Sequence, residues 1–286
     1  MVSELQKLKD FIQKQHEGLV PKKVEVHPKT GRTFQRTQWV RPEEAEEVKE
    51  IKIPPGVIED IHKSFSRVSE KDSSPFRRSL EIRAIREDLE PVYKEHGFDP
   101  SDVISIFSHW KVGSRTNKSI GFMSYLLMKK DTGTNEDEVI KSILDVISPG
   151  FTKEHIKGAV AEIKNHIVKS KSLFDFHKKL IDSIIGNKKL VLYRGANGST
   201  FKEPVGKGSK LTINDTLPIS RWTLQKDVAV DFMREKSRPD KEAHVLMVEV
   251  GADKIHYADG ISLCREFTEE VEFGIDASGL DAEVIE

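Results

Sequence analysis

The character of the chain changes at Lys188-Lys189-Leu190-Val191-Leu192-Tyr193-Arg194-Gly195. The apolar run 190–193 is typical of a strand, whereas the apolar residues before it recur at helical spacing. Short runs of β-forming residues follow it toward the C-terminus. A helical front and a strand-rich back indicate an α+β fold and not alternating βαβ units.

Apolar periodicity between residues 56 and 187 predicts a helical subdomain. Pro91 favours a kink or break near the end of its second helix, because proline removes a backbone donor. The region 188–286 is expected to be a strand-rich core with one short helix over 227–234. The helices are expected at about 57–68, 80–92, 99–110, 118–129, 135–148, 152–169 and 172–185, and the strands at 190–193, 245–250, 254–257 and 271–275.

Residues 1–50 form an appendage of different composition. A short helix is expected over 3–17. Basic and apolar residues then alternate over 20–42 around His27-Pro28-Lys29-Thr30-Gly31-Arg32, which indicates two short strands and a turn. An acidic segment fills 43–50, and Pro54-Pro55-Gly56 marks the boundary. The basic segment could contact phosphates, although a solvated hairpin is the commoner explanation of such a run.

The composition excludes several classes of protein. The 286 residues carry 46 Lys and Arg against 47 Asp and Glu, so no global basic field indicates nucleic-acid binding. The single cysteine, Cys264, excludes a disulfide framework. No apolar run is long enough to span a membrane, and the first residues lack the apolar region of a secretory signal. These observations predict a cytoplasmic protein with no membrane partner.

Several apparent motifs do not match a functional pattern. Gly206-Lys207-Gly208-Ser209 lacks a Ser or Thr directly after its Lys, so it does not fit a phosphate-binding loop. His155 and His166 are too far apart on one predicted helix to share a metal ion without an outside ligand. Cys264 has no nearby His to activate it as a nucleophile. No metal is therefore expected.

Three segments of the strand-rich region combine into one constellation. The first is Tyr193-Arg194-Gly195, at the end of a predicted strand. The second is Ser220-Arg221-Trp222-Thr223, followed by the helix that bears Phe232. The third is 267–273, Phe-Thr-Glu-Glu-Val-Glu-Phe, with two carboxylates two residues apart. Each is weak alone, because a strand-end Arg is usually ion-paired and Ser or Thr ahead of a helix is an ordinary cap.

In this order the three segments resemble the mono-ADP-ribosyltransferase family of the Arg–Ser–Glu class, which includes bacterial toxins and transferases carried by bacteriophages. The resemblance covers roughly residues 185–280, and the helices from about 56 resemble the helical subdomain that precedes the core in that family. One departure is that the family's Ser-Thr-Ser is here Ser220-Arg221-Trp222-Thr223. Ser220 is therefore the first choice for the motif serine, and Thr223 is its substitute. The resemblance implies two small twisted β-sheets with a cleft for NAD+, which is a substrate.

The resemblance implies cleavage of the nicotinamide–ribose bond and transfer of ADP-ribose to an acceptor. Breaking this bond develops positive charge on the ribose, as in glycoside hydrolysis. Glu272 is expected to stabilise that charge through the ribose 2′-hydroxyl. Glu270 is expected on the same face of an extended segment, about 7 Å along the chain, where it would serve as the base for an arginine acceptor.

The other residues of the constellation are expected to bind substrate. Arg194 fits the pyrophosphate, because a planar guanidinium binds phosphate oxygens in a bidentate manner. Tyr193, Gly195, Thr223 and Phe232 complete the predicted NAD-binding set. Ser220 is expected to hold Glu272 in its working rotamer or to touch the nicotinamide ribose. Phe267 is a candidate for acceptor recognition, with core packing as the alternative.

The leading hypothesis is a mono-ADP-ribosyltransferase, a glycosyltransferase acting on a macromolecule, with arginine on protein as the first acceptor. RNA or DNA is the runner-up acceptor, and water as acceptor would make the protein an NAD glycohydrolase. A non-catalytic phage structural or scaffold module is the alternative from another class. The presence of Arg194, Ser220, Glu270 and Glu272 together argues against it. An antitoxin or inhibitor would be a further partner of a toxin of this kind.

Overall fold

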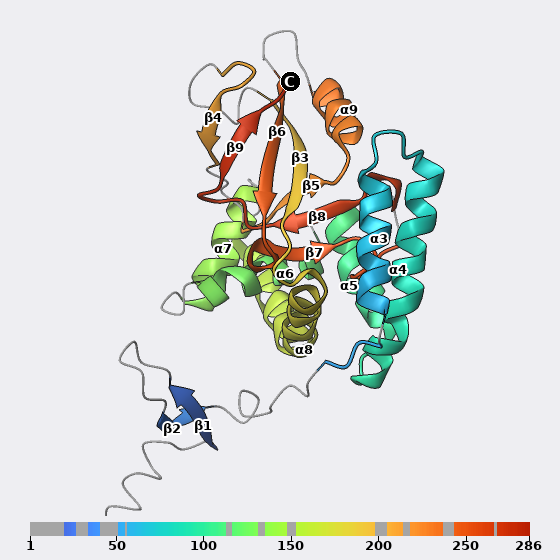
Figure 1. Cartoon of the computed structure of the whole chain (residues 1–286). Helices are drawn as coiled ribbons and strands as arrows, with labels where there is room; N and C mark the ends of the chain where they lie inside the picture. Colours follow the sequence, from blue (N-terminus) through green and yellow to red (C-terminus); the bar gives the residue numbers. More distant parts are fainter. Residues whose placement is uncertain are drawn as a thin grey trace, which may run out of the picture. The chain divides into compact units, whose positions relative to one another are not determined.

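The computed structural model divides into two compact units, residues 1–50 and 51–286 (Figure 1). Within the first unit, β1 (Val20–Val26) and β2 (Phe34–Val40) pair antiparallel, which confirms the two predicted strands. The predicted helix 3–17, the turn and the acidic segment 43–50 lie outside the described residues. The structure describes residues 20–26, 34–40, 51–54, 56–112, 116–130, 135–147, 153–197, 205–213, 218–236, 243–265 and 268–286.

The second unit is α+β, as the sequence predicts, and begins with six helices in its described part. These are α3 (Val57–Ser69), α4 (Pro75–Glu95), α5 (Pro100–Val112), α6 (Asn117–Lys130), α7 (Glu136–Ile147) and α8 (Lys153–Ile185). The start of α4 follows the usual rules, with Ser74 Oγ accepting a hydrogen bond from the Arg77 amide at 3.2 Å and proline in the first turn. The helix continues through Pro91 to Glu95, so the predicted break at Pro91 is wrong.

The two helices expected at 152–169 and 172–185 are one helix, α8. Its buried stripe advances by alternating steps of four and three residues, which is the period of a helix face. Ser170 occupies one position of that stripe and is buried, so the apolar pattern is interrupted there although the helix is not. The stripe consists of Ile163, Ile167, Ser170, Phe174, His177, Ile181 and Ile184.

After α8, the described residues contain seven strands that form one sheet with the order β4-β9-β6-β3-β5-β8-β7, in which every registered pair is antiparallel. The sequence predicts β3, β6, β7 and β8 but misses the other three, which are only three or four residues long. Helix α9 (Lys226–Lys236) lies between β5 and β6. The strands are β3 (Leu190–Asn197), β4 (Lys210–Thr212), β5 (Ser220–Thr223), β6 (Ala243–Val250), β7 (Ile255–Ala258), β8 (Glu272–Ile275) and β9 (Asp281–Val284).

The sheet has a narrow joint between β3 and β5. Eight residue pairs join β3 to β6, whereas a single registered pair, Tyr193 with Thr223, joins β3 to β5. Figure 1 shows the axes of the antiparallel strands β3, β6 and β9 lying side by side, with β7 and β8 crossing that axis. Helix α3 packs on this second half, where the Phe65 and Phe273 rings lie 5.5 Å apart between α3 and β8. The joint is where the predicted site residues gather.

Two histidines are held neutral in the interior. Burial lowers the pKa of His177 to about 3 and that of His256 to about 4. His177 Nδ1 lies 2.6 Å from the Tyr93 hydroxyl, which in turn donates to the Ile261 carbonyl at 3.0 Å. Because the Tyr93 hydroxyl proton is donated to the Ile261 carbonyl, His177 Nδ1 must carry a proton and donate it to the Tyr93 hydroxyl oxygen.

The lowered pKa values of these two histidines predict that the protein loses stability in acid. Each histidine binds a proton in the unfolded chain below a pKa of about 6.5 but in the folded chain only below its depressed value. The two neutral histidines make their full contribution to the unfolding free energy above about pH 6.5. As the pH decreases toward 4, each of them lowers the unfolding free energy by about 1.4 kcal/mol per pH unit. Urea unfolding of the wild type and His256→Gln across pH 7 to 4 measures this. The variant should gain stability relative to the wild type as pH falls, and a constant difference would contradict the buried neutral state of His256.

Candidate active site

The three segments of the predicted constellation lie on three neighbouring strands, β3, β5 and β8. Tyr193 pairs with Thr223, and Thr223 pairs with Glu272 on its other side. Residues paired directly across antiparallel strands present their side chains on the same face, with Cβ atoms about 5 Å apart. Tyr193, Thr223 and Glu272 therefore form a row across the joint of the sheet.

The strand register distinguishes the two candidates for the motif serine. Ser220 pairs with Ile275 and lies three positions from Thr223 on β5, so alternation places it on the opposite face from Glu272. Its Oγ accepts a hydrogen bond from the Trp222 indole at 2.9 Å. Thr223 is directly opposite Glu272, and its Oγ1 donates to the Glu270 carbonyl at 2.5 Å. The register favours Thr223 over Ser220 as the hydroxyl beside Glu272.

The two glutamates are not on one extended segment, so that expectation is wrong. Glu270 ends the 3₁₀ turn Thr268–Glu270, and Glu272 begins β8. Between them Val271 has φ 47°, in the left-handed region that a β-branched residue rarely adopts. Such strain persists only where surrounding structure imposes it, and it concentrates at functional sites. The kink gives Glu270 and Glu272 independent orientations.

Contacts on both sides hold this kinked segment in place. The Glu272 amide donates to Asp259 Oδ2 at 2.8 Å, and the Asp259 amide donates to the Glu272 carbonyl at 3.0 Å. Upstream, Thr268 Oγ1 donates to Ser79 Oγ on α4 at 3.1 Å. Glu272 itself is only 4 % exposed. Asp259 and Ser79 were not found from the sequence, because neither belongs to a motif.

The structure does not place all the predicted residues on one face. Arg194 follows Tyr193 on β3, so alternation sends its side chain to the face of Trp222 and Ser220. Its guanidinium carbon lies 5.8 Å from the Trp222 ring centroid, a cation–π distance. Phe232 is half-buried on α9, and Phe267 lies outside the described residues.

Gly195 allows α9 to approach β3 closely. A Cβ atom at this position would lie 2.4 Å from the Ala229 carbonyl oxygen and 2.5 Å from the Met233 amide nitrogen, both backbone atoms of α9. The absence of a side chain is therefore what lets the helix rest on the strand.

We expect Gly195→Ala to lower the unfolding free energy by about 1–3 kcal/mol, because an overpacked core forces backbone shifts. Gly158→Ala is the matched control, since a Cβ atom there has no neighbour within 4 Å on helix α8. The control should gain about 0.5–1 kcal/mol from helix propensity. Denaturant unfolding of the pair measures both, and equal effects would show that α9 does not depend on close contact at Gly195.

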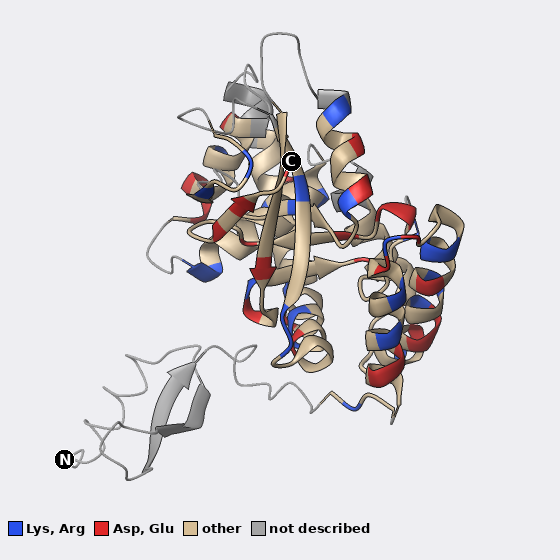
Figure 2. Cartoon of the chain, turned by 45° about the horizontal axis from the view of Figure 1, so that its top comes forward, with Lys and Arg blue, Asp and Glu red and all other residues tan. Residues whose placement is uncertain are grey.

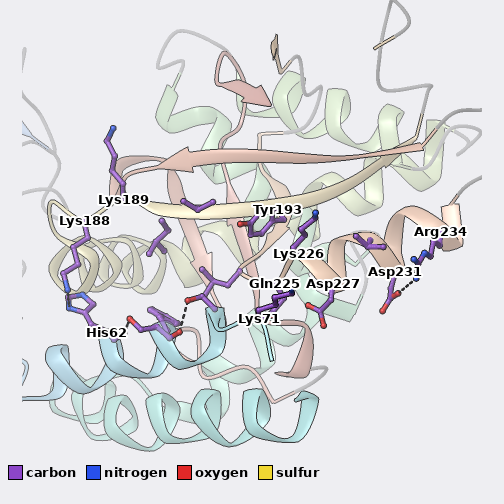
Figure 3. A pocket seen from close by; sticks show the side chains of 17 residues that line it. His62, Lys71, Lys188, Lys189, Tyr193, Gln225, Lys226, Asp227, Asp231 and Arg234 are labelled. Atoms are coloured by element: carbon purple, nitrogen blue, oxygen red, sulfur yellow. Dashed lines mark hydrogen bonds and ion pairs between the residues drawn. The ribbon is translucent and has the colours of Figure 1, made fainter. Parts of the chain in front are cut away.

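A cleft of about 860 Å³ opens between α3, β3 and α9 (Figure 3). Tyr193, one end of the row described above, lines it. Figure 3 shows Lys188 and His62 at one end of the cleft and Asp231 and Arg234 at the other. The volume falls within the range of about 300–1,000 Å³ that is usual for small-molecule sites. This cleft could not be predicted from the sequence, because its residues come from three separate elements and share no motif.

Two groups that line the cleft are held by well-defined contacts. His62 Nε2 lies 2.6 Å from the Ile184 carbonyl, which fixes the proton on that nitrogen, so Nδ1 accepts from Lys188 Nζ at 2.7 Å. Both carboxylate oxygens of Asp227, in the first turn of α9, accept from Arg78 Nη1 at 3.1 Å. Arg78 lies on α4, so one helix anchors both α9 and the turn that leads to Glu270.

Charges of both signs are interspersed on this unit, as Figure 2 shows along α3 and α4. Within the described ranges, no group of three or more His, Cys, Asp or Glu side chains is arranged to hold a metal ion. No helix in the described part of the chain is long and apolar enough to cross a membrane.

Comparisons with known proteins give no assignment. No protein-family model matches the sequence, and neither the curated proteins nor the solved structures include a match.

Proposed function

We propose that the protein is a mono-ADP-ribosyltransferase, which cleaves the nicotinamide–ribose bond of NAD+ and transfers ADP-ribose to a macromolecular acceptor. The observation that carries this proposal is the row Tyr193–Thr223–Glu272, because it joins three segments that are far apart in sequence. A carboxylate that is only 4 % exposed begins a strand there, beside a threonine hydroxyl. The narrow joint of the sheet also suits a core of two small twisted sheets with the cleft alongside.

Each residue of the proposed site has a separate role in the transfer reaction. In the transfer, the bond from ribose C1′ to the nicotinamide nitrogen breaks, and its electron pair leaves with neutral nicotinamide. Positive charge then develops on the ribose, and Glu272 stabilises it, since a preorganised carboxylate in a water-poor site interacts strongly. Thr223 fixes the Glu270 carbonyl and thus the turn that separates the two glutamates. Arg194 is given no role here, because alternation along β3 places its side chain on the opposite face of the sheet from Glu272.

Glu270 is the second carboxylate, and the kink at Val271 separates its orientation from that of Glu272. An arginine acceptor needs such a base, because the guanidinium is protonated at neutral pH and has no free lone pair. The acceptor nitrogen bonds to C1′ and loses its proton to Glu270. Arginine on protein is therefore the proposed acceptor.

The test is incubation of purified protein with NAD+ labelled in the adenylate and a cell lysate, followed by nuclease or protease treatment. Label that survives nuclease and is lost with protease supports a protein-directed transferase. Label lost with nuclease moves the acceptor to RNA or DNA, and free ADP-ribose without transfer means a glycohydrolase. Intact NAD+ throughout would overturn the enzymatic proposal and favour a non-catalytic role.

A further inference from the structure

The cleft between α3, β3 and α9 contains a buried hydrogen-bond donor with no acceptor. Gln225 is only 3 % exposed and lines the cleft, and its Nε2 has no hydrogen-bond partner among the described residues. An amide NH₂ has two donors and is normally satisfied when it is buried. The Gln225 backbone is fixed, since its amide donates to Thr223 Oγ1 at 3.1 Å. The buried NH₂ group of Gln225 thus lacks an acceptor among the described protein atoms.

Further donors face the same space. Tyr193 lines the cleft, and its hydroxyl can donate a hydrogen bond. Figure 3 shows Tyr193, Gln225 and Lys226 together in the middle of the cleft, between α3 and α9. A ligand that enters here meets donors and needs several acceptor atoms.

The charges of the cleft leave an excess of two cations. Three of the five lining cations are paired with acids: Lys189 with Glu249, Lys226 with Glu286 and Arg234 with Asp231. The remaining acid, Asp227, is held by Arg78 from α4. Lys188 Nζ lies 2.7 Å from His62 Nδ1, and among the described residues neither Lys188 nor Lys71 forms an ion pair with an acid. Two lysines are therefore left to attract an anion.

We propose that this cleft binds a phosphate-bearing ligand, with Gln225 and Tyr193 as donors at its centre and Lys71 and Lys188 at its rim. A phosphate group fits because it combines negative charge with several acceptor oxygens, whereas a cation would meet the two uncompensated lysines. Apolar side chains of Phe65, Leu224 and Val230 also line the cleft and suit a flat organic moiety beside the phosphate. The site is separate from Arg194, which points to the other face of β3, and the proposal does not require NAD+ turnover.

The phosphate can come from a dinucleotide or from a nucleic-acid backbone, and the test separates the two. Isothermal titration calorimetry of the full chain uses three probes: inorganic pyrophosphate, NAD+, and a single-stranded RNA of about ten nucleotides. We expect binding of at least one probe that weakens as salt is raised, as charged contacts do. Tight binding of RNA alone assigns the cleft to a nucleic-acid strand, and tight binding of NAD+ assigns it to the dinucleotide. Failure of all three probes to bind the wild type overturns the proposal.

Variants then locate the bound probe. Gln225→Glu replaces the donor by a like charge of nearly the same shape and should weaken binding by more than about tenfold. Lys71→Ala with Lys188→Ala should weaken it by about tenfold, and because both side chains are exposed the fold is retained. Lys207→Ala, on an exposed lysine outside the cleft, is the matched control and should bind like the wild type. If the double lysine variant binds like this control, the proposal is wrong, whether or not Gln225→Glu folds.

Discussion

Glu272→Gln should reduce ADP-ribosyl transfer from NAD+ by about 10²–10³-fold in kcat, the usual effect of removing one preorganised electrostatic group. The amide has nearly the same shape as the carboxylate but cannot balance positive charge on the ribose. Since the side chain is buried at the start of β8, the substitution removes charge without opening a cavity. KM for NAD+ should change little, because the lost interaction is made mainly in the transition state.

Glu269→Gln is the matched control, a neighbouring and half-buried glutamate in the same turn. It should retain activity within about twofold, and thermal unfolding should show all three proteins folded. Initial rates of nicotinamide release measure turnover independently of the acceptor. Equal rates for Glu272→Gln and the control would remove Glu272 from the mechanism while leaving NAD+ turnover itself established.

The helices were largely predictable, because helix faces repeat over several turns and each turn adds to the signal. The prediction failed where a single buried polar side chain entered the stripe, as Ser170 does in α8. The short strands were less predictable. In β5 the residues Ser220 to Thr223 have the composition of a helix cap, and only pairing with β8 and β3 makes them a strand. Such pairing is tertiary, so local pattern does not contain it.

The sequence offers candidate residues for a site but not their geometry. Motif order predicts that Arg194, Ser220, Glu270 and Glu272 belong together, whereas the strand register places Thr223 opposite Glu272 and puts Arg194 and Ser220 on the other face of the sheet. The left-handed Val271 could not be anticipated, because a valine favours extended backbone. Gln225 and Arg78 carry no motif at all, and only burial and contact identify them.

Arg78 connects the helical and strand-rich regions through an ion pair with Asp227, and the two side chains differ in exposure. Its side chain is 5 % exposed, whereas that of Asp227 is 55 % exposed. The guanidinium has lost most of its hydration and depends on Asp227 for compensation, but the carboxylate retains water on its open side. Removing Arg78 and removing Asp227 should therefore lower the unfolding free energy by different amounts, although both changes remove the same contact.

We expect Asp227→Ala to lower the unfolding free energy by about 3–5 kcal/mol, since it leaves a buried guanidinium uncompensated. Loss of a favourable acid in the first turn of α9 accounts for only about 0.3–1 kcal/mol of this. Arg78→Met should cost less, because methionine fills the buried space and Asp227 stays hydrated. Urea unfolding of both variants measures the difference.

The double variant Arg78→Met with Asp227→Ala decides whether compensation of the buried charge is the cause. Once the guanidinium is gone, removing Asp227 should add little, so the double variant should be close to Arg78→Met and more stable than Asp227→Ala. Additive effects would show that the residues act independently and that α9 is held by its packing on Gly195 alone. A smaller loss for Asp227→Ala than for Arg78→Met would mean that water reaches the guanidinium from the cleft when the carboxylate is removed.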